Sequence, residues 1–340
     1  MKVLIIGASG FIGSHLIANI LTSKPSWNIV ALDIQQHNLK DYLSHPSLHF
    51  VSGDMTQMQS WIEEQIQICD VVLPLAAIAT PATYVQDPLK IFSLDFEANL
   101  EIVKLCVKHK KRIVFPSTSE VYGMCNDTEF DEEKSNLILG PIHKERWIYA
   151  CSKQLMDRLI FAYSNHNGLP YTLFRPFNWI GPKQDDISNK KLGGSRVVTQ
   201  FLGNIIRKEN IQLVEGGNQY RSFIYIDDAI EALIKIIENE NECATQRIFN
   251  IGNPHNIASI RELAQMLLSI AKQHPSFEQH ATEIELIDVP AKEYYGAGYQ
   301  DVQARVPSIW RAQTHLQWQP RTDLYTALSK TVEYYLNYVS

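Results

Sequence analysis

The strongest constraint on the fold is a glycine-spaced turn close to the N-terminus. Residues 3–6 are an apolar run, and Gly7, Gly10 and Gly13 follow at intervals of three. Glycine permits a tight turn, a close approach of backbone to a ligand, and close packing of a helix on a strand. An amphipathic stretch then continues to about residue 21 and predicts a helix, whose free N–H groups would attract a diphosphate. The pattern therefore predicts the first strand and helix of a nucleotide-binding parallel sheet.

The second expected strand, residues 29–32, ends in Asp33, twenty residues beyond Gly13. An acid at this distance binds the ribose hydroxyls of NAD and repels the extra phosphate of NADP. No arginine follows closely to receive that phosphate, so the residues favour NAD as the cofactor. Phe11 and Ile12, at the start of the helix, are further expected cofactor contacts, while Asp33 could instead be a turn or helix-cap residue.

Strands and helices continue to alternate up to about residue 175. The segments expected to be strands are 48–51, 70–75, 113–115 and 171–175, and a long helix is expected from about 89 to 109. Three more residues of this part are predicted cofactor contacts, namely Asp54 near the adenine, Ala76 in a loop of small residues, and Asn99 on the long helix. The alternation predicts an α/β fold: a Rossmann-type doubly wound parallel sheet with a smaller C-terminal substrate-binding lobe.

The expected division of the chain follows from where this regular alternation stops. Residues 1–175 should form the NAD-binding domain, and residues 225–255 return to it with one more helix and strand. Residues 176–224 and 256–340 are more irregular and should form the substrate-binding lobe.

Composition and charge exclude several classes of protein. A formal net charge of −6 gives no electrostatic reason to expect nucleic acid or an anionic membrane as a partner. The five cysteines are odd in number and scattered without a C-x-x-C pair, so neither a disulfide framework nor a metal site is expected. No run approaches eighteen apolar residues, and the first strand is too short for a signal segment, so we expect a cytoplasmic protein.

The strand expected at residues 112–115 stops abruptly in Ser117, Thr118, Ser119 and Glu120. Buried parallel strands end in this way where they open into a ligand crevice. A carboxylate at the end of a buried strand is costly unless it is paired or used, so Glu120 is a candidate catalytic residue or a buried acid paired with a structural cation. Ser119 could act in the chemistry or could cap the helix that follows the strand.

Tyr149 and Lys153 lie four residues apart, so they project from the same face of an expected helix. A cation beside a phenol favours the phenolate, and we therefore expect Lys153 to lower the pKa of Tyr149. Thr118 would then share the proton of a substrate hydroxyl with Tyr149. Taken alone, such a pair is common on solvated helix faces. The strand end and the glycine turn upstream are what favour a catalytic role for Tyr149 and Lys153.

Together these motifs resemble the extended short-chain dehydrogenase/reductases of the NAD-dependent epimerase/dehydratase family, over almost the whole chain. The segments that carry the likeness are 116–124, 146–149, 174–179 and 294–302. At residues 118–120 the chain has Thr-Ser-Glu, like the UDP-glucuronic acid decarboxylases of the family, whereas sugar 4,6-dehydratases carry Thr-Asp-Glu. The likeness is tightest to the decarboxylase domains of bifunctional polymyxin-resistance proteins, and the formyl transfer of their other half is not expected here.

The resemblance implies oxidative decarboxylation of UDP-glucuronic acid by NAD, giving a UDP-4-ketopentose, CO₂ and NADH. The residues that it assigns to the chemistry are Thr118, Ser119, Glu120, Tyr149, Lys153 and Arg305. Tyr149 would deprotonate the C4 hydroxyl, and Glu120, Ser119 and Arg305 would handle the departing carboxylate and the proton that replaces it. Without the resemblance, Arg305 reads as a surface residue that precedes a turn.

The nucleotide of the substrate is expected to meet Asn178, Arg196 and Arg221, because arginine binds diphosphates in a bidentate manner, and Tyr299 is a further expected substrate contact. The family also implies a homodimer through the helices that carry Asn99 and Tyr149. Three alternatives stay open: a UDP-xylose synthase that returns the hydride, a UDP-glucuronate 4-epimerase, and a non-catalytic NAD-sensing protein.

Overall fold

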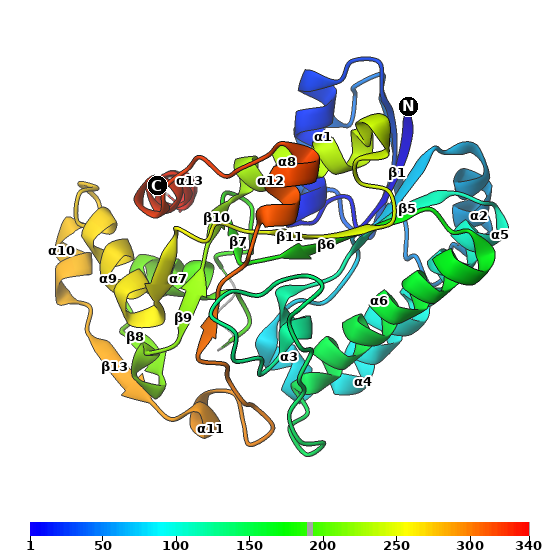
Figure 1. Cartoon of the computed structure of the whole chain (residues 1–340). Coiled ribbons are helices and arrows are strands. Elements are labelled where there is room, and N and C mark those ends of the chain that lie inside the picture. Colours follow the sequence, from blue (N-terminus) through cyan, green and yellow to red (C-terminus); the bar gives the residue numbers. More distant parts are fainter. Residues whose placement is uncertain (189–192, 340) are drawn as a thin grey trace.

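A seven-stranded parallel sheet forms the centre of the molecule (Figure 1). The computed structural model describes residues 1–188 and 193–339. The strands of the large sheet are β1 (Lys2–Ile6), β2 (Asn28–Asp33), β3 (Leu48–Ser52), β4 (Val71–Pro74), β5 (Arg112–Pro116), β6 (Tyr171–Pro176) and β11 (Arg247–Ile251). Their order is β11-β6-β5-β4-β1-β2-β3, and all neighbours run parallel. This is the predicted doubly wound fold.

Strand β1 shows why the chain forms such a sheet. Its side chains alternate between the two faces, so that Val3 and Ile5 enter one hydrophobic core while Leu4 and Ile6 enter the other. Both faces of the sheet are therefore covered, which requires the uninterrupted apolar run seen in the sequence. The chain leaves β1 towards β3 on one side and resumes at β4 on the other, which places a topological switch point between β1 and β4.

Helices cover the two faces of the large sheet. One core is closed by α1 (Phe11–Ser23), α8 (Ile226–Glu238) and α12 (Trp310–Leu316), which lie above the sheet in Figure 1. The other is closed by α2 (Gln59–Ile68), α5 (Asn99–Lys108) and α6 (Trp147–Asn167). Shorter helical elements of the large lobe are η1 (His37–Tyr42), α3 (Pro81–Gln86), η3 (Ser119–Tyr122) and η5 (Glu240–Glu242).

The long helix expected at 89–109 is one continuous helix with an irregular middle. It begins as α4 (Pro88–Ile91), widens into a π-helical stretch η2 (Phe92–Ala98), and continues as α5. The side chain of Asp87 caps its start by accepting a hydrogen bond from the Lys90 amide. Short π-helical insertions are rare and occur frequently at functional sites. The amphipathic pattern of the sequence does not distinguish this stretch from an ordinary α-helix.

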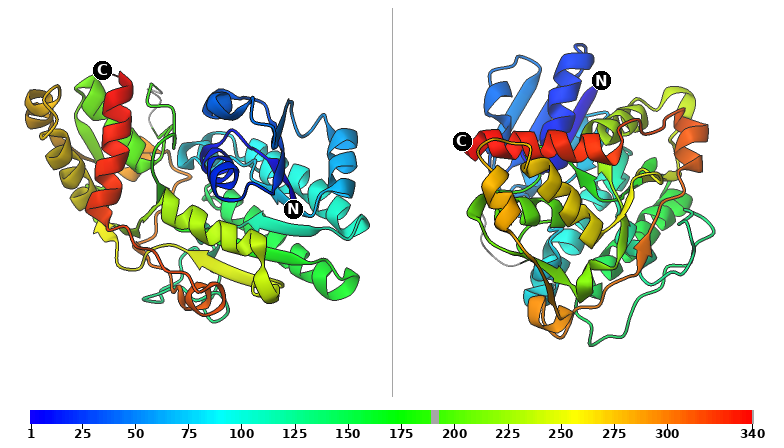
Figure 2. Two further views of the ribbon diagram at one scale, coloured as in Figure 1. Left: turned by 90° about the horizontal axis from the view of Figure 1, so that it is seen from above. Right: turned by 90° about the vertical axis from the view of Figure 1, so that its left-hand side faces the viewer.

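A smaller lobe lies beside the large sheet, on the left in Figure 1 and in the left view of Figure 2. Its helices are α7 (Val197–Arg207), η4 (Glu215–Gly217), α9 (Ile260–Ala271), α10 (Glu278–Glu283), α11 (Ala291–Tyr294) and α13 (Leu324–Val339). Its strands are β7 (Trp179–Ile180), β8 (Ile211–Val214), β9 (Tyr220–Ser222), β10 (Ile224–Tyr225), β12 (Ile257–Ser259), β13 (Leu286–Val289) and β14 (Ala304–Arg305). They pair as β12-β9-β14, β13-β8 and β10-β7. The residue boundaries that the sequence predicts for the two lobes remain a prediction.

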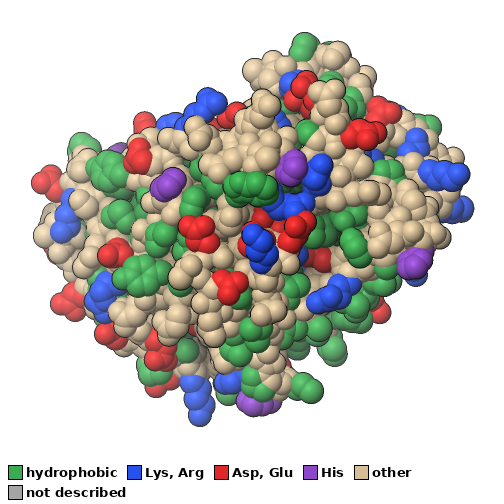
Figure 3. Space-filling model, viewed as in Figure 1, with side chains coloured by type: hydrophobic (Ala, Val, Ile, Leu, Met, Phe, Trp, Pro, Cys, Tyr) green, Lys and Arg blue, Asp and Glu red, His purple; other side chains and the backbone are tan. Residues whose placement is uncertain are grey.

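None of the helices in residues 1–188 and 193–339 is both long enough and apolar enough to cross a membrane. On the face seen in Figure 3, basic and acidic side chains are interspersed and meet near the middle. Such mixed charge on this face agrees with the small net charge of the chain.

Candidate active site

A cavity of about 1130 Å³ lies between the carboxyl ends of the large sheet and the smaller lobe. This volume is above the usual range of about 300–1,000 Å³ for a single small-molecule site, so a dinucleotide and a second ligand can share it. The predicted site residues that line it are Gly7, Gly10, Phe11, Ile12, Gly13, Asp33, Thr118, Ser119, Glu120, Tyr149, Lys153, Asn178, Arg196, Arg221, Tyr299 and Arg305. Parallel strands that end at one edge bring together side chains far apart in the chain.

The glycine turn forms one end of the cavity and fits a dinucleotide. Gly7 has a positive φ of 83°, and a Cβ atom there would lie only 2.5 Å from the Ala76 amide nitrogen, so no other residue fits. Helix α1 begins at Phe11 without a side-chain cap and without an acid in its first turn. Its first N–H groups are thus open to an anion such as a diphosphate.

Asp33 stands at the end of β2, next to the glycine turn. Its Oδ2 accepts a hydrogen bond from the Ser9 amide at 2.8 Å, and its Oδ1 accepts one from the Gln35 amide at 3.0 Å. A carboxylate has about four acceptor positions, so oxygens held in this way can still accept from ribose hydroxyls. The turn, the helix start and this acid together fit the diphosphate and ribose of NAD.

Three predicted cofactor residues, all in the described part of the chain, lie outside the cavity lining: Asp54, Ala76 and Asn99. The Asp54 carboxylate accepts from the amide and the hydroxyl of Thr56, both at 2.8 Å, which closes its own turn. The Asn99 Nδ2 donates to the Ala76 carbonyl oxygen at 3.2 Å and to the Leu94 carbonyl oxygen at 2.9 Å. Any part that Asn99 has in cofactor binding is therefore through the loop at Ala76.

Helix α6 delivers Tyr149 and Lys153 to the cavity from one face, as predicted. The Lys153 Nζ donates to the Pro116 carbonyl oxygen at 3.0 Å, at the end of β5, and lies 6.0 Å from the centre of the Tyr149 ring. The ring of Tyr84 stacks on that of Tyr149, with centroids 4.6 Å apart and planes 8° from parallel. Helix α3 carries Tyr84, so the phenol of Tyr149 is held between two elements of the large lobe.

The pKa of Tyr149 differs from the expectation. We expected Lys153 to lower it, but burial raises the pKa of Tyr149 and the charge of Asp95 raises it further, while a hydrogen bond with Thr118 lowers it. Burial likewise lowers the pKa of Lys153. Loss of hydration disfavours both charged forms, and in a dry site this effect exceeds that of one nearby cation. A further positive charge, such as the oxidised nicotinamide of NAD, would act in the direction that the phenolate requires.

Glu120 lies between two arginines at the cavity wall. Its Oε2 accepts from Arg146 and its Oε1 accepts from Arg305. Burial alone would raise the pKa of Glu120, but the two guanidinium groups outweigh it and hold the pKa below its ordinary value. The Glu120 amide donates to the Thr118 hydroxyl at 3.2 Å, so Thr118 rather than Ser119 caps the turn η3.

A second ion pair lies beside the first. Arg221 donates to Asp301 Oδ1 at 2.5 Å, and β14 pairs with β9 so that Arg305 stands opposite Arg221. Arg146 donates to the Gln300 carbonyl oxygen at 2.9 Å. The three guanidinium groups exceed the two carboxylates of the cluster by one, so this cluster carries one net positive charge.

Two more of the predicted substrate residues, Asn178 and Tyr299, also lie at the cavity wall. Asn178 Nδ2 donates to the Ser222 carbonyl oxygen at 2.7 Å, and Asn178 itself is in a left-handed conformation with φ 40°. Tyr299 stacks on Tyr295 with ring centroids 4.1 Å apart. Both side chains are therefore fixed in place at the cavity wall.

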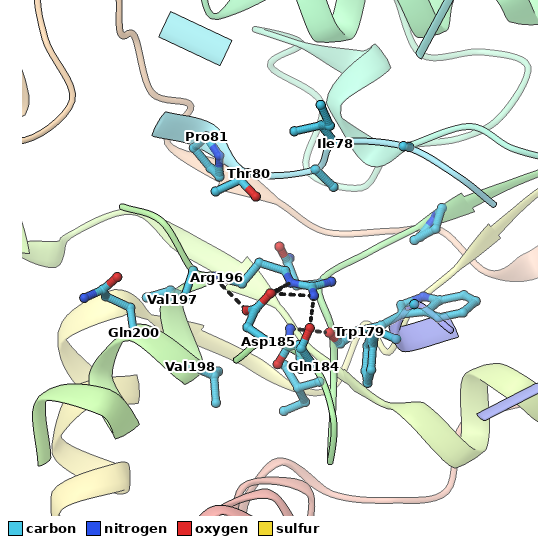
Figure 4. A pocket seen from close by; sticks show the side chains of 18 of the residues that line it. Ile78, Thr80, Pro81, Trp179, Gln184, Asp185, Arg196, Val197, Val198 and Gln200 are labelled. Carbon is cyan, nitrogen blue, oxygen red and sulfur yellow. Dashed lines mark hydrogen bonds and ion pairs between the residues drawn. The ribbon is translucent and has the colours of Figure 1, made fainter. Parts of the chain in front are cut away.

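Arg196 is also fixed, by partners of its own lobe. Its Nη2 lies 2.7 Å from Asp185 Oδ1 and also donates to the Gln184 carbonyl oxygen, and its guanidinium group lies 5.2 Å from the centre of the Phe11 ring. Figure 4 shows this group facing Thr80 and Pro81 across the cavity. Each lobe therefore forms one wall of the cavity.

Sequence reasoning did not single out Tyr84, Arg146 or Asp301, all of which line the cavity. Arg146 had a signal, because it lies three residues before Tyr149 and therefore near the same face. Tyr84 comes from a helix with no motif of its own, and Asp301 lies in the segment 294–302 that carries the family resemblance, although no role was assigned to it. Within the described ranges, no group of three His, Cys, Asp or Glu side chains could hold a metal ion.

The chain is similar to known proteins over most of its length. Residues 3–252 match the NAD dependent epimerase/dehydratase family. The crystal structure of the PbgP3 protein from Burkholderia pseudomallei is 51% identical, with a TM-score of 0.91 over 99% of this chain and 97% of that chain. UDP-glucose 4-epimerase from Thermotoga maritima is 22% identical, with a TM-score of 0.82 over the whole of both chains.

A third structure, UDP-glucuronic acid 4-epimerase from Bacillus cereus in complex with UDP-glucuronic acid and NAD, is also 22% identical, with a TM-score of 0.82 over 99% of this chain and 100% of that chain. The two likenesses at 22% concern the fold alone, whereas the family match covers most of the chain. NAD is the cofactor of this family, and the glycine turn, helix α1 and Asp33 fit it. The chain belongs to the NAD dependent epimerase/dehydratase family.

Proposed function

We propose that this protein catalyses the oxidative decarboxylation of UDP-glucuronic acid, giving a UDP-4-ketopentose, CO₂ and NADH. The observation that carries the proposal is the position of Glu120 between Arg146 and Arg305 on the wall that also holds Tyr149. An enzyme acting on neutral hexoses has no use for the two arginines that flank Glu120 at the sugar. A uronic acid brings a carboxylate, and guanidinium groups bind carboxylates in a bidentate manner.

The charge of the cluster supports this class of substrate. Arg146, Arg221 and Arg305 face Glu120 and Asp301, which leaves one positive charge for one substrate carboxylate. The pKa of Asp301 is lowered to about 2, because Arg221 and the other arginines outweigh the effect of burial. Both acids are therefore ionised at neutral pH, and the net charge of the cluster does not change over the working range.

The first half of the proposed reaction oxidises C4 of the sugar. Tyr149, as phenolate, takes the proton of the C4 hydroxyl, and Thr118 holds the phenol through a hydrogen bond. Lys153, fixed on the Pro116 carbonyl oxygen, supplies a cation behind the ring of Tyr149. NAD⁺, when bound, supplies the acceptor for the C4 hydride. The product of this half is a ketone at C4 and a protonated Tyr149.

The second half breaks the bond between C5 and C6. The carboxylate at C6 is now beta to the ketone, so CO₂ leaves and the electron pair of the broken bond forms an enolate. The protonated Tyr149 donates a hydrogen bond to the enolate oxygen, and C5 then takes a proton. Arg305 orients the carboxylate or assists this protonation, and Glu120, which Arg305 contacts, and Ser119 on the cavity wall relay the proton from solvent to C5.

The UDP portion is assigned to the cavity end at Asn178, Arg196 and Arg221. Relatives of the same fold bind such nucleotides: the 22% identical Thermotoga maritima enzyme was crystallised with UDP-glucose. Arg196 is already paired with Asp185, so it would offer the diphosphate its remaining N–H groups and its charge rather than an unpaired guanidinium group.

The proposed assembly is a homodimer through α5 and α6. Leu155 and Phe161, both on α6, are 45% and 53% exposed, and we assign these two apolar side chains to the interface between the copies. Replacing both with glutamate should convert a dimer to a monomer in sedimentation analysis. A parent protein that is already monomeric at micromolar concentration would contradict this assembly.

The experiment that tests the function is incubation of purified protein with UDP-glucuronic acid and NAD⁺, following absorbance at 340 nm and the mass of the sugar nucleotide. Stoichiometric NADH with loss of CO₂ and a hydrated ketone supports the proposal. Loss of CO₂ without net NADH would instead establish a UDP-xylose synthase, and an isomer of unchanged mass a 4-epimerase. Binding of NAD⁺ without any turnover of uronic acids would contradict the proposal and favour a sensing protein.

A further inference from the structure

A buried asparagine outside the cavity is bonded to two segments that carry site residues. Asn250, near the end of the edge strand β11, has no exposed surface and does not line the cavity. Its Oδ1 accepts a hydrogen bond from the Tyr122 hydroxyl at 2.8 Å. Its Nδ2 donates to the carbonyl oxygen of Phe130 at 2.7 Å and to that of Ser308 at 3.2 Å. One side chain therefore joins β11 to three segments that are far apart in the sequence.

The first of these segments is the turn that carries Glu120. Tyr122 is the last residue of η3, two positions after Glu120. The hydroxyl of Tyr122 accepts a hydrogen bond from Arg175 Nη1 at 2.9 Å and donates one to Asn250. Its ring packs against that of Phe130, with centroids 4.7 Å apart. The end of η3 is therefore held both by the ring and by the hydroxyl of one buried tyrosine.

The second segment follows Arg305, which is the last residue of β14 and lies three positions before Ser308. This segment runs beside Phe130. The Phe130 amide donates to the Val306 carbonyl oxygen at 2.8 Å, and the Phe130 carbonyl oxygen accepts from the Ser308 amide at 2.9 Å. Because Asn250 Nδ2 donates to the carbonyl oxygens of both Phe130 and Ser308, it ties this bridge to the large sheet.

Packing joins the same segment to the end of β11 a second time. Gly252 directly follows the strand, and a Cβ atom there would lie 2.8 Å from Pro307 Cγ. The ring of Pro307 therefore packs directly on the glycine, where no other side chain fits without a shift. Hydrogen bonds from Asn250 and this contact two residues later fix the chain just after Arg305.

We propose that Asn250 is a positioning residue that holds Glu120 and Arg305 in the geometry in which they act on the substrate carboxylate. The two partners come from segments 185 residues apart, and both segments are bonded to this one side chain. Asn250 does not reach the cavity, so its influence passes through Tyr122 and Ser308. The expected effect on the rate rests on the proposed function, whereas the effect on the ion pair does not.

A purely structural asparagine would make the same contacts, and coupling to Arg305 separates the two roles. Loss of a structural residue lowers the fraction of folded protein, which reduces every step of the reaction and acts equally in every variant background. A positioning residue acts through the ion pair, so its loss has no further effect on the chemistry once Arg305 is removed. Substitutions at independent sites are additive, and departure from additivity measures this coupling.

The substitution Asn250→Leu removes all three side-chain hydrogen bonds and keeps a branched side chain. A misplacement of about 1 Å in a reacting group can cost about 10²-fold in rate, and we expect CO₂ release from UDP-glucuronic acid to fall by about that factor. NADH formed in the first turnover should be retained, because oxidation at C4 uses Tyr149 rather than the ion pair. Rapid mixing and quenching, with mass spectrometry of the sugar nucleotide, measures both.

In the double variant Asn250→Leu with Arg305→Met, CO₂ release should be no slower than in Arg305→Met alone. An equal fall of CO₂ release in both backgrounds, or a parallel fall of NADH and CO₂ in Asn250→Leu, overturns the inference.

The matched control is Asn256→Leu. Asn256 is also buried and does not line the cavity, and its Nδ2 donates to the Thr322 carbonyl oxygen at 2.9 Å. This variant should lose stability but keep the parent ratio of CO₂ to NADH. An Asn256→Leu protein in which that ratio falls as far as in Asn250→Leu overturns the inference, because loss of any buried amide would then have the same effect.

A second readout does not need the sugar substrate. In urea unfolding, Arg305→Met should shift the midpoint less in the Asn250→Leu background than in the parent, because the ion pair is already displaced. In the Asn256→Leu background the shift should equal that in the parent. If UDP-glucuronic acid is not turned over but this coupling is seen, the proposed function fails and the inference about the pair stands. Equal shifts in all three backgrounds overturn the inference on their own.

Tyr122→Phe supplies the same two cycles if Asn250→Leu does not fold. It keeps the ring that packs on Phe130 and removes only the hydroxyl that donates to Asn250. Its effects on CO₂ release and on the urea midpoint should again be smaller once Arg305 is replaced. Full additivity of Tyr122→Phe with Arg305→Met would show that this bond does not position the pair and would overturn the inference.

Discussion

Glu120 and Arg305 form an ion pair across the candidate active site although they lie 185 residues apart in the chain. Glu120 comes from η3, which follows β5 of the large sheet, and Arg305 comes from β14 in the smaller lobe. The pair therefore exists only when the two lobes meet. A substrate carboxylate that enters the cavity would compete with Glu120 for the same guanidinium group, and the acid so released would lie next to the reacting carbon.

The first prediction concerns Arg305→Met, which keeps the length of the side chain and removes its charge. Glu120 stays paired with Arg146, so the fold and NAD⁺ binding should be retained. Loss of one charged group that acts on the departing carboxylate typically costs about 10²–10³ in turnover. We expect CO₂ release from UDP-glucuronic acid to fall by at least that factor, measured by mass spectrometry of the sugar nucleotide.

The matched control for this variant is Arg311→Met. Arg311 pairs with Glu133, whose side chain is largely exposed, and neither residue lines the cavity. This control should decarboxylate at the parent rate. Substantial decarboxylation by Arg305→Met would remove Arg305 from its assigned place in the chemistry.

The second prediction concerns the phenol of Tyr149. Tyr149→Phe keeps the ring that stacks on Tyr84 and removes only the hydroxyl. General acid–base groups contribute about 10²–10⁴ to a rate, and here one group serves both halves of the proposed reaction. NADH formation followed at 340 nm should fall by three orders of magnitude or more, while NAD⁺ still binds.

The control for Tyr149→Phe is Tyr163→Phe. Tyr163 lies on the same helix and packs against the core that α2, α5 and α6 close. The control removes a phenol of the same chemistry that does not line the cavity, so its rate should equal that of the parent. Measurable NADH formation by Tyr149→Phe at a tenth of the parent rate would show that another group takes the proton.

The elements that the sequence predicted well are those set by local pattern. The strands of the large sheet, the helix start after Gly7 and the shared face of Tyr149 and Lys153 each depend on a few neighbouring residues. The direction in which the pKa of Tyr149 shifts could not be predicted. It depends on burial and on Asp95, which lies on a different helix.

The same reasoning explains which site residues were missed. Arg146 donates to Glu120, 26 residues before it in the chain, and to the Gln300 carbonyl oxygen, 154 residues after it. Asp301 has no recognisable spacing to Arg221, which it meets through a loop 80 residues further on. Contacts between segments far apart in the chain have no sequence period, so no pattern within one element indicates them.

The third prediction concerns the choice between the two nicotinamide cofactors. Asp33 places a negative charge beside the glycine turn, held by the amides of Ser9 and Gln35. A carboxylate there repels the 2′-phosphate of NADP⁺, and each 1.4 kcal/mol of discrimination is a factor of about ten. Asp33→Asn should therefore improve the affinity for NADP⁺ relative to NAD⁺ by about tenfold, measured by calorimetry.

Asp70→Asn is the control for the cofactor experiment. Asp70 accepts from the Lys2 amide at 2.7 Å, at the opposite end of the large sheet, and should leave the affinity ratio unchanged. An Asp33→Asn protein that still prefers NAD⁺ by the parent ratio would assign the discrimination to the shape of the site rather than to this charge.

The last prediction concerns stability and Glu132, which lies beside the edge strand β11. Its Oε1 accepts from the Asn250 amide at 2.8 Å, an edge N–H group that would otherwise lack a strand partner, while its Oε2 is buried and has no hydrogen-bond partner within the described ranges. Burial raises the pKa of Glu132 to about 7. The folded protein therefore holds a proton that the unfolded chain releases near its ordinary pKa of about 4.3.

Because the folded pKa is the higher one, this group favours folding at low pH and loses that contribution as pH rises from about 4 to about 7, above which the loss is constant. Glu132→Gln keeps an oxygen for the Asn250 amide and removes the charge. We expect the variant to be more stable than the parent at pH 8, by on the order of 3 kcal/mol, and nearly equal to it at pH 4. Urea unfolding at the two pH values measures the difference, and Glu133→Gln, at an exposed neighbour, should show almost none. A Glu132→Gln protein that is less stable than the parent at pH 8 would mean that the carboxylate is stabilised where it lies.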